Sequence, residues 1–364
     1  MKMSLRLKIA SKALLFVIIF GIIGYAVMYV LTPKWTGGKD KVTSTVVDFY
    51  QEPDNTIDVL FLGTSNAAHG FSPLLLWENE GIASYSLSTQ VQPPLISYYF
   101  LKEALKHQDL KMVVVDVSGF YKFYNYDNER IKRYIRKTID FLPLSSLKIQ
   151  MVSEIVRDSK KSTFLNFFCP VAEYHDRWQE IKDYDFKSVV NEYSTKGADI
   201  SGDIFPFEFE SDYMIKRDPA SGEMNDKGED YLKRIVDICR ENDITLILTS
   251  LPKSSWRIEN SEALQEFCAE YNVPYIDYNQ AELREAIQLN SQTDYYDGGL
   301  HLNMLGAEKV TLHLSDYLKE NFNLPDHRGD DTYAEWEKDL SQFNQVFLKF
   351  KQDINSAQEE TADS

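Results

Sequence analysis

Two short stretches far apart in the chain carry side chains that could together activate a hydroxyl group. In the first, Ser65 follows a short apolar run and a glycine. In the second, Asp297 and His301 lie in a glycine-rich loop just ahead of an amphipathic segment. A serine hydroxyl needs a base to take its proton, and a histidine base needs a carboxylate to fix its tautomer. The pattern therefore indicates nucleophilic chemistry by Ser65, with His301 as the base and Asp297 as its partner.

The same residues are open to other interpretations. Thr64 and Ser65 also suit the cap of the helix that follows them. His69 is expected to be a loop histidine that hydrogen-bonds backbone carbonyls, and a role as the base is the alternative. A metal-dependent hydrolase built on His69, His301 and Asp297 is a further hypothesis, but no His-x-His or His-Glu-x-x-His spacing supports it.

The elements around Ser65 predict how these stretches are brought together. Residues 57–62 form an apolar run without polar alternation, which is typical of a parallel strand buried on both faces. Ligands bind at the carboxyl ends of such strands, where Ser65 lies. Further strands are expected at 83–87, 112–117, 244–250 and 273–277, with helices at 74–79, 94–106, 231–241, 262–271 and 302–319. We therefore predict a flavodoxin-like, three-layer α/β/α fold with a parallel five-stranded sheet in the order 2-1-3-4-5.

Residues 119–230 interrupt this alternation and are rich in aromatic and charged side chains. Helical periodicity is expected at 128–160 and 170–190. We interpret the region as a helical insertion between the third and fourth strands. A lid or substrate-shaping subdomain and ordinary helical packing are both open as its role.

The N-terminal residues predict a membrane anchor. Residues 1–12 carry four basic side chains and no acid, and residues 13–31 are apolar without a charge. That run is close to the ~20 residues that a helix needs to cross a bilayer. The positive-inside rule then predicts a cytoplasmic head and an extracytoplasmic remainder, joined by a tether at 32–55 to a domain at 56–325. A cleaved signal peptide is the alternative, although no small-x-small cleavage site follows the run.

The C-terminal segment 326–364 carries an amphipathic aromatic pattern that could pack on the domain or meet a partner, and its acidic end is expected to be disordered. The net charge of −17 makes nucleic acid an unsuitable partner, because a phosphate backbone is repelled. The three cysteines fit no metal-ligand spacing, so free thiols are expected, with one disulfide as the alternative. No motif predicts a metal or a cofactor. No glycine-rich nucleotide loop follows any strand.

These residues resemble the SGNH (GDSL-type) hydrolase family over roughly residues 55–320, with the insertion excluded. The family's first block, a strand ending in Gly-Asp-Ser, corresponds here to Gly63-Thr64-Ser65. Its last block corresponds to Asp297 with His301. The single anchor makes the chain similar to extracytoplasmic members of the DltD and AlgJ/AlgX types. The resemblance implies acyl transfer or hydrolysis by a Ser-His-Asp triad without a metal or cofactor.

The chain departs from the family pattern at three points. Thr64 replaces the family Asp, which is not a triad member. Asp297 and His301 are one residue further apart than in Asp-x-x-His, so Asp294 or a backbone carbonyl is an alternative partner for the histidine. The family's oxyanion blocks are indistinct, and residues 88–90 stand where its glycine block should fall. The candidate oxyanion and substrate-binding residues are Ser88, Gln90 and Asn66; the expected oxyanion donors are the backbone N–H groups of Ser65 and Ser88 and the side-chain amide of Gln90.

The expected function is that of an extracytoplasmic serine acyltransferase or esterase. Its expected substrates are O-acyl groups, acetyl or D-alanyl, on a cell-envelope polysaccharide or a teichoic-acid-like acceptor, with a membrane-bound O-acyltransferase as a partner. The alternative is a catalytically degenerate scaffold or glycan-binding partner of such an acyltransferase. The indistinct oxyanion blocks favour the alternative, whereas the retained Ser65, Asp297 and His301 favour an enzyme.

Overall fold

The computed structural model describes residues 5–34, 42–187, 194–210, 213–215 and 222–362. Its centre is a parallel five-stranded sheet in the order β2-β1-β3-β4-β5. The predicted α/β fold and strand order are therefore confirmed. The strands are β1 (Val59–Gly63), β2 (Ser84–Ser88), β3 (Met112–Asp116), β4 (Thr245–Ser250) and β5 (Tyr275–Asp277).

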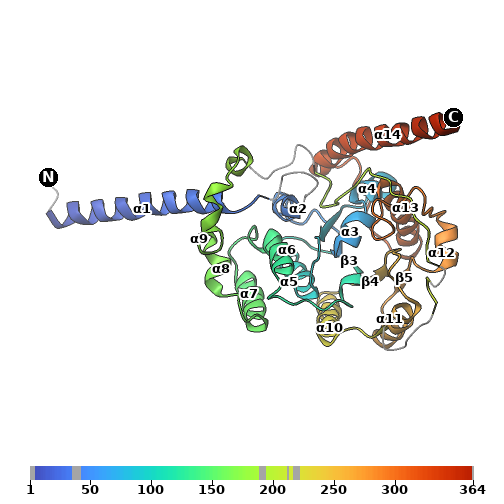
Figure 1. Cartoon of the computed structure of the whole chain (residues 1–364), viewed down its shortest axis with the longest axis horizontal. Helices are drawn as coiled ribbons and strands as arrows, with labels where there is room; N and C mark the ends of the chain where they lie inside the picture. Colours follow the sequence, from blue (N-terminus) through green and yellow to red (C-terminus); the bar gives the residue numbers. More distant parts are fainter. Residues whose placement is uncertain (1–4, 35–41, 188–193, 211–212, 216–221, 363–364) are drawn as a thin grey trace.

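Helices cover both faces of the sheet (Figure 1). Leu60 and Leu62 face a core shared with α2 (Val42–Phe49), α5 (Pro94–Ala104), α10 (Asp226–Glu241) and α11 (Ile258–Tyr271). Val59 and Phe61 face the opposite core, shared with α3 (Ser65–Gly70), α4 (Pro73–Glu80) and α13 (Met304–Asn321). All residues of β1 are buried because neighbouring strand residues point to opposite, equally covered faces. Short helices η1 (Val117–Gly119) and α12 (Ala281–Ala286) follow β3 and β5.

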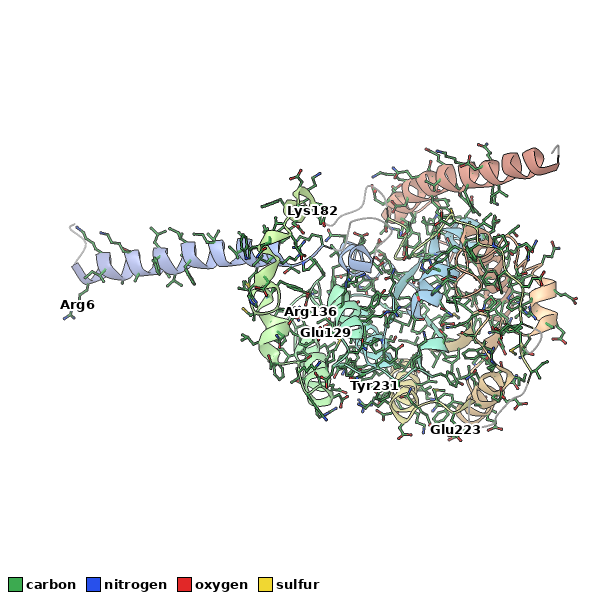
Figure 2. The ribbon with its side chains drawn as sticks, viewed as in Figure 1. Arg6, Glu129, Arg136, Lys182, Glu223 and Tyr231 are labelled. Atoms are coloured by element: carbon green, nitrogen blue, oxygen red, sulfur yellow. The ribbon has the colours of Figure 1, made fainter. Side chains whose placement is uncertain are left out.

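The N-terminal helix α1 (Leu5–Leu31) extends away from the α/β domain (Figures 1 and 2). Its segment Lys8–Leu31 is long and apolar enough to cross a membrane, and only 6% of its most apolar window is buried by the rest of the chain. Such a helix fits a membrane span, and by the same criteria a signal sequence. Within the expected tether, α2 packs on the domain with Val46 and Phe49 buried.

The expected insertion contains α6 (Glu129–Ile139), α7 (Ser146–Asp158), α8 (Phe164–Phe168), α9 (Pro170–Tyr174), η2 (His175–Gln179) and η3 (Asp183–Phe186). Arg136, labelled in Figure 2, joins two of these helices: its Nε donates to the Tyr174 hydroxyl at 2.7 Å. Further along, the Phe205 N–H donates to the Tyr295 carbonyl at 2.8 Å. The insertion therefore contacts the loop that carries Asp297 as well as the end of α1.

The aromatic side chains of the C-terminal segment pack on the domain and are buried there. η5 (Asp331–Tyr333) leads into α14 (Ala334–Ala362), whose Trp336 ring lies 5.0 Å from the ring of Trp77 in α4. Tyr333, Phe343 and Phe347 share the same buried cluster. The helix continues through Ala362, in the acidic segment for which composition predicts disorder.

The three cysteines are free thiols. Burial raises the pKa of both Cys239 and Cys268 to about 12, so neither is a reactive thiolate at neutral pH. Cys239 and Cys268 are buried, as expected, whereas Cys169 is half-buried.

Candidate active site

Ser65 is placed by a sharp turn from β1 into α3. A Cβ on Gly63 would lie 2.7 Å from the Ala67 Cβ and 3.1 Å from the Asp116 Cβ, so a larger residue would push strand and helix apart. Thr64 is the N-cap of α3, and its hydroxyl accepts a hydrogen bond from the Asn66 N–H at 3.4 Å. The capping interpretation therefore holds for Thr64, while Ser65 is the first helical residue and its side chain is directed elsewhere.

Asp297 and His301 belong to a tight loop ahead of α13. An antiparallel bridge between Tyr295 and Leu302 closes this loop. Gly298 and Gly299 inside it have φ values of 75° and 88°, a backbone region that favours glycine. Asn303 then caps α13, accepting hydrogen bonds from the N–H groups of residues 305 and 306. The glycines allow the chain to reverse so that Asp297 faces His301.

The two distant stretches meet at the carboxyl edge of the sheet. The Ser65 Oγ lies 2.7 Å from the His301 Nε2. The His301 Nδ1 lies 2.5 Å from one oxygen of Asp297, and the other oxygen accepts the His301 backbone N–H at 2.8 Å. The side chains of His301 and Asp297 are 20% and 28% exposed, so solvent and small molecules can reach them. A hydroxyl, an imidazole and a carboxylate in this order can move a proton from the serine oxygen to the ring.

The charge state of Asp297 suits this arrangement. Partial burial alone would raise the pKa of the Asp297 carboxyl. The hydrogen bonds and charge of His301, together with the Leu300 N–H, outweigh that effect and bring the pKa below its usual value. Asp297 is therefore ionised at neutral pH and able to stabilise a protonated His301.

Asp294, the alternative partner for the histidine, lies in a different environment. It is fully buried and forms an ion pair with Lys309 at 2.7 Å. It also accepts the Asn290 backbone N–H at 2.7 Å. Its hydrogen bonds hold the loop that precedes Asp297 instead of reaching His301.

His69 is a helical residue, so the expectation of a loop position is wrong. Thr64 caps the short helix α3, which begins before the first helix expected after this strand, at 74–79. His69 falls in the last turn of α3. Its Nε2 lies 3.0 Å from the Tyr296 hydroxyl and 3.5 Å from an oxygen of Asp199. The centres of the His69 and His301 rings are 5.3 Å apart. The Tyr296 ring stacks on the His301 ring, with their centres 5.5 Å apart. His69 and Tyr296 thus brace the imidazole of His301.

The three candidate oxyanion and substrate-binding residues differ in their surroundings. The Ser88 hydroxyl is buried and donates to the Phe61 carbonyl at 3.4 Å, a contact between β2 and β1. Gln90 is half-buried at the start of the following loop. The Asn66 side chain is 5% exposed, and among the described residues its amide nitrogen has no hydrogen-bond partner. A buried donor without a partner lowers the stability of the fold, which indicates that a bound acceptor would satisfy it. Asn66 is therefore the strongest of the three candidates for an oxyanion donor.

Two further charged residues at this edge are absent from the sequence-based candidates. Asp116 ends β3 and is fully buried, and burial raises the pKa of its carboxyl despite hydrogen bonds from Ser118 and the Leu251 N–H. Lys253 follows β4 and is 8% exposed. Burial and the charge of Lys122 lower its pKa, and the charges of Asp116 and Asp297 partly offset that shift. The available signal was position alone: Asp116 lies at the carboxyl end of β3, and Lys253 lies shortly after the carboxyl end of the neighbouring parallel strand β4.

Among the residues that the structure describes, no group of three or more His, Cys, Asp or Glu side chains could hold a metal ion. The metal-dependent alternative therefore has no donor set within the described ranges, since His69, His301 and Asp297 do not form one.

Neither protein-family models nor curated protein sequences give a match to the chain. Similar solved structures include a protein described as an acylhydrolase from Bacteroides fragilis, with 11% identity and a TM-score of 0.37 over 76% of this chain and 95% of that one. A GDSL-like lipase from Bacteroides thetaiotaomicron has 10% identity and a TM-score of 0.36 over 77% and 97%. A lipolytic G-D-S-L family protein from Desulfitobacterium hafniense has 11% identity and a TM-score of 0.33 over 72% and 99%.

Proposed function

We propose that the chain is a membrane-anchored, extracytoplasmic serine esterase or O-acyltransferase of the SGNH type. The observation that carries the proposal is the hydrogen-bonded series from Ser65 through His301 to Asp297, with distances of 2.7 Å and 2.5 Å. Three residue types in this order are the ones that acyl transfer through a serine requires. The helix Lys8–Leu31 supports an anchor that holds the domain at the membrane surface.

In the proposed reaction the Ser65 Oγ attacks the carbonyl carbon of an O-acyl ester, and its proton passes to the His301 Nε2. Asp297 stabilises the imidazolium that results. The carbonyl oxygen becomes an oxyanion, to which the backbone N–H of Ser65 and the Asn66 amide are the proposed donors. His301 then gives its proton to the leaving alcohol as the carbon–oxygen bond breaks, which leaves an acyl group on Ser65.

The second half of the reaction repeats these steps with a new nucleophile. His301 takes a proton from an acceptor hydroxyl, whose oxygen attacks the acyl-Ser65 carbonyl. The ester bond to Ser65 breaks, and His301 returns the proton to the serine oxygen. A sugar or polyol hydroxyl as acceptor gives transfer, and water gives hydrolysis.

The proposed acceptor is a cell-envelope glycopolymer, a polysaccharide or teichoic-acid-like chain carrying acetyl or D-alanyl esters. An exposed aromatic ring beside the site supports a sugar-containing substrate. Phe205 is 59% exposed, and its ring lies 3.7 Å from the position a Cβ on Gly298 would take, one residue from Asp297. Aromatic faces pack readily against the apolar faces of sugar rings. A membrane-bound O-acyltransferase is the proposed protein partner.

The proposal is tested by labelling with a fluorophosphonate, which reacts with activated serines. The full-length protein should be labelled and should release acyl groups from an ester substrate, and Ser65→Ala should lose both activities. Ser118→Ala is a matched control, since Ser118 is a buried serine that binds Asp116. Mass spectrometry of a glycan acceptor would distinguish transfer from hydrolysis. Absence of labelling in a folded wild-type protein would overturn the enzyme and favour a scaffold or glycan-binding role.

A further inference from the structure

The last turn of α1 is fastened to the insertion by specific hydrogen bonds. Arg177 in η2 donates from one nitrogen to the carbonyls of Val30 and Leu31, each at 3.1 Å. The Tyr29 hydroxyl donates to the Lys187 carbonyl at 2.8 Å. The carbonyls at a helix C-terminus have no partner within the helix, so Arg177 satisfies groups that would otherwise need water. The insertion thus binds the C-terminal end of the apolar helix α1.

Large apolar side chains project from the elements around this point. Trp178 in η2 and Phe186 in η3 are each 65% exposed, and both short helices contact α1 directly. Leu165 and Phe164 in α8 are 62% and 44% exposed, and α8 contacts α9, which also contacts α1. We call these four residues the apolar rim. Figure 1 shows α9 beside the end of α1 and α8 beyond α9.

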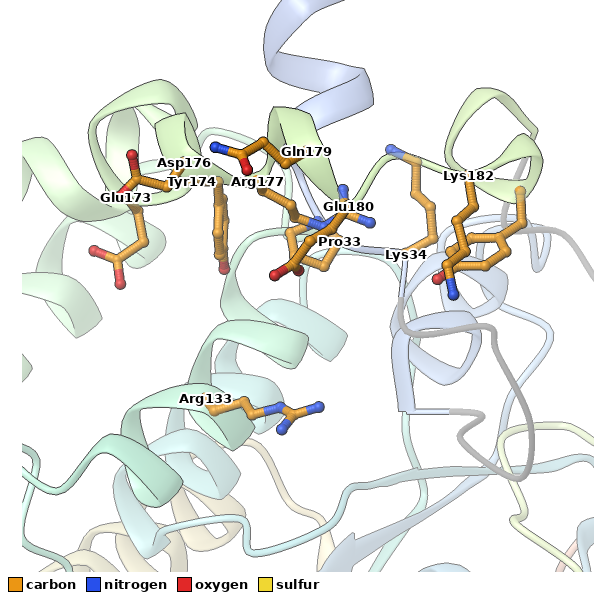
Figure 3. A pocket seen from close by; sticks show the side chains of 11 residues that line it. Pro33, Lys34, Arg133, Glu173, Tyr174, Asp176, Arg177, Gln179, Glu180 and Lys182 are labelled. Atoms are coloured by element: carbon orange, nitrogen blue, oxygen red, sulfur yellow. The ribbon is translucent and has the colours of Figure 1, made fainter.

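A polar cavity of about 870 Å³ opens between the residues that follow α1 and the elements α6, α9 and η2 (Figure 3). Lys34, Arg133, Arg177 and Lys182 line it together with acidic residues such as Glu173 and Glu180. None of Ser65, His301 or Asp297 lines this cavity, so it is separate from the candidate active site. Cationic and anionic groups side by side suit the phosphate and ammonium groups of phospholipid head groups.

We propose that the apolar rim and this cavity form a membrane-resting surface, with Trp178 and Phe186 inserted among lipid head groups when α1 spans the bilayer. The proposal rests on the anchoring part of the proposed function. Its support is continuity: the surface surrounds the end of the apolar helix, and aromatic residues with Lys and Arg are the types enriched at membrane–water interfaces. A rigid link between the anchor and the insertion would set the orientation of the Ser65 site toward the membrane-bound polymer.

The test places a nitroxide label at position 178 in the full-length protein, reconstituted alone in phosphatidylglycerol–phosphatidylethanolamine vesicles. Trp178→Cys is combined with Cys169→Ser, because the other two cysteines are buried. Leu348→Cys in the same background is the control, since Leu348 is 60% exposed on α14, far from α1 in Figure 1. Accessibility to lipid-soluble oxygen is compared with accessibility to a water-soluble nickel chelate.

We expect the oxygen-to-nickel ratio at position 178 to exceed that at 348 by at least about threefold. Equal ratios in protein that floats with the vesicles would overturn the membrane-resting surface and leave the anchor intact. Protection of position 178 from both reagents would overturn it in favour of contact with a second copy of the chain. Failure of the protein to float with the vesicles would overturn both the membrane anchor and the membrane-resting surface. Fluorophosphonate labelling of Ser65 in the same sample reports separately on the enzyme.

Discussion

Asp297 holds His301 at two points, accepting a hydrogen bond from the ring at 2.5 Å and from the backbone N–H at 2.8 Å. The ring bond assigns the proton to Nδ1 and leaves the lone pair of Nε2 facing the Ser65 hydroxyl. The backbone bond fixes the loop that carries the ring. One carboxylate therefore determines both the tautomer and the position of the proposed base.

Asp297→Asn should lower kcat by about 10³–10⁴-fold with little change in KM. The amide oxygen can still accept the backbone N–H, but the amide NH₂ cannot accept the proton on the ring Nδ1. The imidazole of His301 would then favour the tautomer with its proton on Nε2, and that nitrogen cannot accept the Ser65 proton. Steady-state kinetics with an ester substrate measure the effect, and circular dichroism checks that the variant is folded.

Asp294→Asn is the matched control for this change. Asp294 is fully buried and bonded to Lys309, so the variant should lower the melting temperature while kcat stays within about threefold of wild type. Equal losses of kcat in the two variants would contradict the assignment of Asp297 as the partner of His301.

The sequence predicts the sheet and the candidate residues Ser65, Asp297 and His301 because their signals are local. The apolar run ending at Gly63 marks a strand buried on both faces, and Asp297 and His301 are close in the chain. Parallel strands share one carboxyl edge, so topology alone brings Ser65 toward the loop of His301. The distance of 2.7 Å between them follows from the geometry of the turns at Gly63 and Gly298.

Other parts depend on contacts that no local pattern encodes. Whether α14 packs on the domain depends on Trp77, about 260 positions away from Trp336 in the chain. The surroundings of His69 depend on Asp199, within a region of weak periodicity. The position of η2 depends on hydrogen bonds from Arg177 to the carbonyls of Val30 and Leu31, which lie 147 and 146 positions earlier in the chain.

Asn66→Ala should lower kcat by about 10²–10³-fold if the buried amide stabilises the oxyanion. The melting temperature should stay the same or rise, because the change removes a buried donor that has no partner among the described residues. A residue with only a structural role would show the opposite pattern. Ser88→Ala, which removes a 3.4 Å bond to the Phe61 carbonyl, should leave kcat within about threefold. A lower melting temperature with unchanged kcat in Asn66→Ala would contradict the role in catalysis.

Trp336→Ala should destabilise the domain by about 3–5 kcal/mol, because Trp336 is 2% exposed and its ring lies 5.0 Å from that of Trp77. Urea unfolding of the detergent-solubilised full-length protein, followed by circular dichroism, measures the change. Leu348→Ala on the exposed side of the same helix should change stability by less than about 0.5 kcal/mol. Equal urea midpoints for Trp336→Ala and wild type would contradict a stabilising role for the buried Trp336 ring.

Lys253→Met should change how stability depends on pH. Burial, reinforced by the charge of Lys122 and partly offset by Asp116 and Asp297, lowers the pKa of Lys253 from 10.5 to about 8. Below pH 8 the folded protein holds a charged, buried ammonium, which costs stability. Between about pH 8 and pH 10 the unfolded chain binds more protons than the folded one, so the stability of the wild type rises with pH.

Methionine keeps most of the apolar stem of Lys253 and removes the charge. The variant should therefore be more stable than wild type at pH 7, by at most roughly 3 kcal/mol, and the difference should shrink as the pH approaches 10. Urea midpoints at several pH values between 7 and 10 measure this difference. Lys111→Met is the control, because Lys111 is 48% exposed in a surface pair with Asp109 and should give a small difference at every pH. A Lys253→Met difference that stayed constant from pH 7 to 10 would contradict the lowered pKa, since the wild type would then carry the same charge in both states throughout.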